Sequence, residues 1–257
     1  MFEAALFGAV AQFALIVGAI LVWRFPRLKR PALVGSLMAF GAGAVISAVA
    51  IDLVAVSYDE AGELPTALGI AIGCLLYFGI IRLLESRQNK DALATVKQEE
   101  SHTHSGHGAT QQEARNLTIG MVIDGVPESI AIGLTLHTAS LGVSGALVGS
   151  VFISAVPEAI GIAAAMLAGG LAFSRVLLRF SAIVVLGAVF AGVGYTVLVG
   201  ASDSLQAIIQ SVAAGALLVV VINEMIPIAV RSIKAWAGII GAAGFVFAAF
   251  LTWASGG

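Results

Sequence analysis

The chain has 257 residues, of which 59% are hydrophobic and only 11% charged, and its net charge is −2 at pH 7. Together with a mean hydropathy of +1.02, this composition excludes an ordinary soluble enzyme or binding domain and indicates a polytopic membrane protein. The single cysteine, Cys74, excludes an intramolecular disulfide and a cysteine-rich zinc cluster.

Long apolar stretches predict an all-α fold, because about 20 consecutive apolar residues form a helix that crosses the hydrocarbon core. We expect one membrane domain over residues 1–257, a polytopic bundle of eight transmembrane helices. The spans are predicted at residues 4–22, 33–56, 65–84, 117–137, 143–170, 177–199, 206–230 and 235–254. The first has Glu3 where a secretory signal would carry a basic residue, so we interpret it as a retained helix.

The second span contains one acid, Asp52, near its predicted outer end, which we interpret either as a residue of a cation path or as an interfacial acid. After the third span comes a polar connection, 85–116, which contains His102, His104 and His107. Neutral imidazoles bind Zn, Fe, Ni or Cu, so these histidines are a candidate accessory metal site. A disordered linker in which histidines happen to cluster is the alternative.

The fourth span has a proline and carboxylates at its middle, where a charge costs about 2.5 to 3.5 kcal/mol. Pro127 and Glu128 lie at the centre, and Asp124 precedes Glu128 by one helical turn on the same face. Because that spacing is about 6 Å along the axis, the two carboxylates can share one cation.

The fifth span repeats this Val-Pro-Glu pattern at Pro157 and Glu158, with Ser154 one turn earlier. Consecutive spans are antiparallel, so the twin segments predict an inverted repeat whose site lies at the midplane, a common transporter design. Without basic side chains at mid-depth, the carboxylates need another partner. We predict a divalent cation bound by Asp124, Glu128, Glu158 and Ser154, with protonation of buried carboxylates as the alternative.

The seventh span carries Asn223 and Glu224 just before Pro227, in its predicted cytoplasmic third. We interpret both residues as part of the exit path. For Glu224 the alternative is a protonated acid of the core. The sixth span has no carboxylate.

Basic residues occur only in alternate loops, which are therefore predicted to be cytoplasmic, with both termini outside. They are Arg24, Arg27, Lys29, Arg30, Arg82, Arg87, Lys90, Lys97, Arg115, Arg175, Arg179, Arg231 and Lys234. The other loops and the N-terminus carry only acids, namely Glu3, Asp59, Glu60, Glu63 and Asp203.

Taken in this order, the spans, the histidine-containing loop and the Pro-Glu pairs resemble a divergent member of the ZIP (Zrt/Irt-like protein) family of divalent-metal transporters. The family's fourth span typically reads H-N-x-P-E-G, which puts Asp124 at the histidine and Gly125 at the asparagine. The resemblance implies that Glu128 and Glu158 are retained ligands, with Ser154 at the first ligand position of the fifth span. Ala155 and Gly125 offer no side-chain donor, so we expect a single metal.

The resemblance implies uptake of a divalent metal ion across the cell membrane toward the cytoplasm, with Zn, Fe, Mn or a similar ion as substrate and no resident cofactor. An oxygen-only site favours harder ions such as Mn²⁺, Fe²⁺, Mg²⁺ or Ca²⁺. The family likeness also implies a homodimer in the lipid bilayer, and we expect no nucleic-acid partner.

Two other functions stay open. The carboxylates of a proton-coupled carrier of small solutes would relay protons, and a metal-sensing relative would not transport. An enzyme is not expected, because no H-E-x-x-H motif exists and Ser154 lacks a membrane histidine as base.

Overall fold

The computed structural model describes residues 2–96, 118, 121–122, 125–126, 128–130, 132–133, 141–197 and 202–254, and within these all regular structure is helical. In the described part of the chain, six helices are long and apolar enough to cross a membrane, which supports a multi-pass membrane protein. They are Phe2–Arg24, Pro31–Ala61, Glu63–Leu83, Phe173–Thr196, Ser204–Ile233 and Trp236–Ala254. A further helix, α7 (Leu141–Ala168), occupies the fifth predicted span, and the fourth is described only in part.

The first span consists of α1 (Phe2–Gln12) and α2 (Ala14–Arg24), which are separated at Phe13. A short 3-10 turn, η1 (Pro26–Lys29), leads into α3 (Pro31–Ala48). Proline suits the first position of each, because the missing N–H would have no helical partner there. Helix α5 (Glu63–Val96) continues past the predicted third span into the expected loop.

The second and seventh spans are interrupted by π-helical segments. In the second span, α3 passes into η2 (Val49–Ala55) and then α4 (Val56–Ala61). In the seventh, α9 (Asp203–Val220) passes into η3 (Val221–Met225) and then α10 (Ile226–Ile233). Wide π turns occur frequently at functional sites, and the predicted path acids of these spans, Asp52 and Glu224, lie in them.

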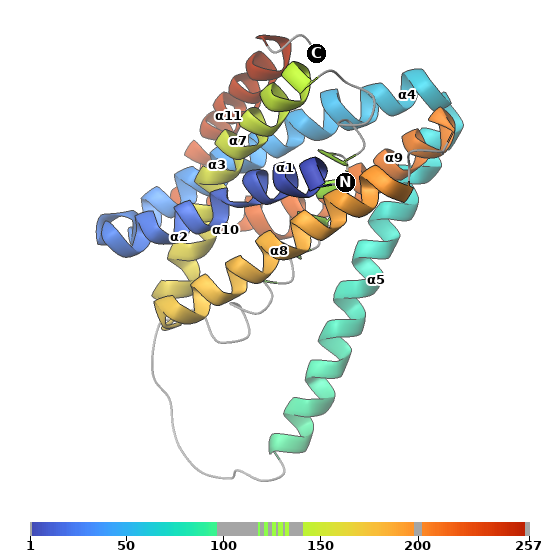
Figure 1. Ribbon diagram of the computed structural model, residues 1–257. Coiled ribbons are helices and arrows are strands. Elements are labelled where there is room, and N and C mark those ends of the chain that lie inside the picture. Colours follow the sequence, from blue (N-terminus) through green and yellow to red (C-terminus); the bar gives the residue numbers. More distant parts are fainter. Residues whose placement is uncertain are drawn as a thin grey trace.

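The helices sort into two groups (Figure 1). The first helix group contains α1, α2, α7 and α8 (Phe173–Val197), against which the described residues between 118 and 133 pack. The second helix group contains α3, α4, α5, α9, α10 and α11 (Trp236–Ala254). Small residues bring the backbones close within each group. Gly18 packs on Ala159 in the first group, and Gly43 packs on Gly241 in the second.

Helices α3 and α7 join the two groups. Met38 of α3 packs on Gly161 of α7, and Gly41 faces Glu158 one turn away. The main hydrophobic core extends across this seam, because it includes Met38, Ile162 and Met225, which come from three different spans. The seam is therefore where residues of the two groups meet in the interior.

Three of the basic loops lie at one end of the bundle. The rings of Trp23 and Phe173 stack with centroids 5.0 Å apart, which joins the end of α2 to the start of α8. Near the same end, Gly35 of α3 packs on Ser232 of α10. The alternation of charge along the sequence thus corresponds to a real asymmetry between the two ends of the bundle.

Candidate metal-binding site

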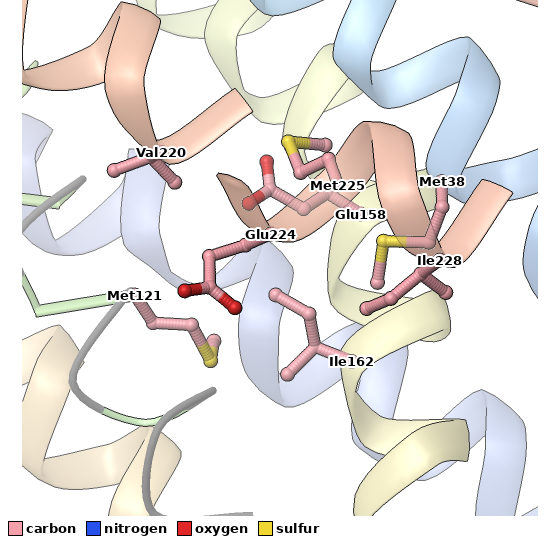
Figure 2. A pocket seen from close by; sticks show the side chains of 8 residues that line it. All are labelled: Met38, Met121, Glu158, Ile162, Val220, Glu224, Met225 and Ile228. Atoms are coloured by element: carbon pink, nitrogen blue, oxygen red, sulfur yellow. The ribbon is translucent and has the colours of Figure 1, made fainter. Parts of the chain in front are cut away.

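A narrow pocket at the seam contains two carboxylates, those of Glu158 and Glu224 (Figure 2). It has room for about one water-sized particle, about 10 Å³. Figure 2 shows the carboxylate of Glu224 directed into the pocket, with that of Glu158 beyond it. The other lining residues that the structure describes are apolar: Met38, Met121, Ile162, Val220, Met225 and Ile228.

Each carboxylate reaches the pocket from a different kind of backbone. Glu158 follows Pro157 inside α7, and its side chain is 8% exposed. Glu224 lies in the π segment η3, where the wider turn changes the direction in which side chains project. Gly41 lets α3 approach, since a Cβ there would lie 3.5 Å from the Cβ of Glu158 and 3.1 Å from the Cε of Met225.

Thioether sulfur belongs to the lining as well as oxygen. Met38, Met121 and Met225 are all buried, and they come from the second, fourth and seventh predicted spans. Methionine sulfur is a soft, polarisable ligand, in contrast to carboxylate oxygen. Around Glu158 the pocket therefore offers a mixed donor set, whereas the sequence led us to expect oxygen alone.

Glu128 has a different partner. The amide Nε2 of Gln12, at the end of α1, donates a hydrogen bond of 3.0 Å to Oε2 of Glu128. Gln12 is buried, and its side chain passes two glycines, Gly125 and Gly187, whose lack of a Cβ leaves room for it. Ser129, also buried, donates to the carbonyl oxygen of Gly125 and closes this part of the interior.

The two glutamates meet the first span on different turns. Gln12 contacts Glu128, whereas Gly18 contacts Ala159 next to Glu158. Residues 12 and 18 are separated by about 9 Å along a helix axis. Glu128 and the Glu158–Glu224 pocket therefore form successive polar positions along the bundle in the described contacts.

Several predicted site residues are not placed together by these contacts. Asp124 lies outside the described residues, and Ser154 lies on α7 with its side chain outside the described part. The four-residue set of Asp124, Glu128, Glu158 and Ser154 thus stays a prediction. In the part of the chain that the structure describes, no three His, Cys, Asp or Glu side chains form a metal-binding cluster.

The predicted path and accessory residues have mixed outcomes. Asp52 in η2 accepts a hydrogen bond of 3.4 Å from Oγ1 of Thr252 in α11. Glu224 lines the pocket beside Glu158, while its neighbour Asn223 is exposed and does not. The candidate accessory site of His102, His104 and His107 lies outside the described residues.

Sequence reasoning missed Gln12 and the methionines. Gln12 was detectable as an uncharged polar side chain inside an apolar span. The methionines gave no signal, because Met38, Met121 and Met225 are far apart in the chain and methionine is an ordinary core residue.

No protein-family model matches the chain. No curated protein matches it either.

Proposed function

We propose that the protein is a carrier of divalent metal cations, moving them across a cell membrane toward the cytoplasm. The observation that carries the proposal is the pocket in which Glu158 and Glu224 come together among apolar and thioether side chains. Carboxylate oxygen and thioether sulfur are both ligands of divalent metal ions, and here they line one pocket inside an apolar bundle.

The ion we propose is a borderline divalent cation such as Zn²⁺, Fe²⁺ or Mn²⁺. Carboxylate oxygen alone would equally suit Mg²⁺ or Ca²⁺, whereas thioether sulfur favours softer ions. Mg²⁺ also gives up its bound water reluctantly. The pocket has room for about one water-sized particle, so a hydrated Mg²⁺ ion would not fit.

Eight spans with both termini outside remain our proposal for the topology, and helix directions support the count. Helices α3 and α7 are antiparallel, because Met38 packs on Gly161 and Gly41 on Glu158. Helix α5 follows α3 and α4 through a tight turn and returns in the same direction as α7. The chain leaves α5 at one end of the bundle and enters α7 at the other (Figure 1).

The position of the pocket at the seam suits alternating access. Glu158 belongs to the first helix group, and Glu224 belongs to the second. A rigid-body movement of one group against the other would separate the two carboxylates and weaken their joint hold on the cation. Carriers built from helix groups around a central site use movements of this kind. In this proposal the ion passes Asp52 first and leaves by Glu224.

The alternative is a proton-coupled carrier, and the same pair of acids favours it. Carboxylates inside membrane spans can relay protons, so the pair lining this pocket would also serve such a carrier. Such a carrier would show pH-dependent flux of its solute without any requirement for a divalent ion.

Reconstituted protein tests the proposal. Influx of Zn²⁺, Fe²⁺, Mn²⁺, Co²⁺ and Mg²⁺ is measured in liposomes for the wild type, for Glu158→Gln with Glu224→Gln, and for the surface variant Glu3→Gln. We expect saturable influx of the borderline ions in the wild type and in Glu3→Gln, with mutual competition between ions. Equal influx in the double variant, or no metal influx in any protein, would exclude the proposed function.

A further inference from the structure

Gln12 occupies a space that the surrounding sequence leaves open for it. A Cβ on Gly187 would lie 2.6 Å from its Cγ, and a Cβ on Gly125 would lie 3.2 Å from its Nε2. Side chains at either position would displace the glutamine. At 6% exposure Gln12 is shielded from the surroundings, although an apolar residue of the same length would fill the space without a polar group to satisfy.

The amide of Gln12 donates a hydrogen bond to the carboxylate of Glu128. An ionised carboxylate only accepts hydrogen bonds, so it is the amide nitrogen that faces Glu128, at 3.0 Å. This bond fixes one oxygen of Glu128. A carboxamide has a second face, the carbonyl Oε1, which is an oxygen ligand of the kind that binds divalent cations.

We propose that Gln12 is a cation ligand that exchanges its hydrogen bond to Glu128 for a bond to the metal. In the structure its N–H group donates to Glu128. When a divalent cation reaches Glu128, a half-turn about the Cγ–Cδ bond brings Oε1 onto the ion. The inference rests on the proposed function, because it assigns Gln12 to the route of the same cation.

The position of Gln12 makes this binding step separate from the pocket at the seam. Its contact with Glu128 lies on a different turn of the first span from the contact beside Glu158. Gln12 also ends α1, and the chain resumes as α2 only after Phe13. A carboxylate and an amide would thus hold the ion at one level, and Glu158 with Glu224 at the next.

Metal binding to the purified full-length protein in detergent tests the inference directly. Titration calorimetry with Mn²⁺ and with Zn²⁺ compares the wild type, Gln12→Leu and the matched control Gln206→Leu, which removes a buried glutamine from α9. We expect Gln12→Leu to weaken binding by about 10- to 100-fold, as loss of an outer partner or neutral ligand commonly does. Gln206→Leu should bind metal as the wild type does.

Moving the amide from residue 12 to residue 125 tests whether Gln12 acts as a metal ligand or only as a packing residue. Gln12→Ala removes the amide, and adding Gly125→Asn puts a new one where the Gln12 amide was, since that Cβ would lie 3.4 Å from Cδ and Oε1 of Gln12. We expect the double variant to bind metal at least several times more tightly than Gln12→Ala. We also expect Gly125→Asn alone to bind metal more weakly than the wild type, because the new side chain crowds Gln12. The effects of the two substitutions on metal affinity are therefore expected not to add.

The failures of the inference and of the proposed function are distinguishable. If the wild type binds no metal, the proposed function fails and the inference fails with it. If the wild type binds metal and Gln12→Leu binds it equally well, only the inference is overturned. A folded double variant without recovery would assign Gln12 to packing and would also overturn it, with circular dichroism reporting the helical fold.

Discussion

The two helix groups place their acids in the interior by different means. In the first group, Glu158 follows a proline inside a long α-helix, and Glu128 is held by a hydrogen bond from Gln12. In the second group, Asp52 and Glu224 lie in π segments that interrupt the second and seventh spans. Proline removes a backbone hydrogen bond, whereas a π turn widens the helix and keeps its side chains at altered angles.

This difference is most informative where the groups meet. At the seam, a residue of each kind lines the same pocket, Glu158 from the proline-containing helix and Glu224 from the π segment (Figure 2). Irregular backbone inside a membrane is tolerated where it is buried in protein or lines a cavity. The proline of α7 and the π segment η3 therefore both lie beside the seam pocket, although they alter the helix in different ways.

The largest expected effect comes from removing one carboxylate of the pair. Glu158→Gln and Glu224→Gln should each reduce metal influx by about 100-fold or more, the size expected when one partner of a buried charged set is lost. Together they should reduce it little further, because the two act on one ion. Initial rates of influx into liposomes provide the measurement, and additive losses would show that the two groups act separately.

Filling the seam should have the next largest effect. Gly41→Leu would place a branched side chain against Met225 and Glu158, which lie 3.1 and 3.5 Å from a Cβ at that position. Overpacking of this kind costs about 1 to 3 kcal/mol, so we expect a lower maximal rate of influx and a changed metal affinity. Gly79→Leu is the matched control, since nothing lies within 4 Å of a Cβ there. If both variants transport equally, the pocket at the seam is not on the route.

Much of the fold could be predicted from the sequence, because membrane helices need long apolar stretches. The predicted first, second, third, sixth, seventh and eighth spans each overlap a membrane-length helix of the described structure, for example Phe2–Arg24 and Trp236–Ala254. The extension of α5 to Val96 was not predicted, because a polar helix outside the hydrocarbon has no hydropathy signal. The π segments were not predicted either, since hydropathy does not distinguish a π turn from an α turn.

The candidate site was predictable only as a list of acids. Glu128, Glu158 and Glu224 are conspicuous because a charge inside a span is costly. Their partners depend on which helices pack together, and hydropathy contains no information on that. The pairing of Glu224 with Glu158, and of Gln12 with Glu128, comes from the contacts at the seam and within the first group.

A smaller effect is expected from the sulfur in the pocket. Met225→Leu keeps the volume and removes a thioether, so the fold should tolerate it. We expect inhibition of Mn²⁺ influx by the soft ion Cd²⁺ to weaken by about 5-fold, equivalent to about 1 kcal/mol, with Mn²⁺ influx itself little changed. Met166→Leu is the control, because Met166 is buried in α7 and does not line the pocket. An unchanged Cd²⁺ effect would show that sulfur only fills space.

The smallest effect on metal influx should come from changes at η2, the π segment that contains Asp52 and does not line the seam pocket. Asp52 accepts one long hydrogen bond, 3.4 Å, from Thr252. A single hydrogen bond contributes about 0.5 to 1.5 kcal/mol, and this length favours the lower end, so Thr252→Val should change the KM for metal by about 2-fold. Asp52→Asn should change it more, because it also removes a charge from the proposed entry. If Thr252→Val and Asp52→Asn instead abolish influx as Glu224→Gln does, the two π segments are equally important for transport. The expected difference between a π segment at the seam pocket and one away from it would then be wrong.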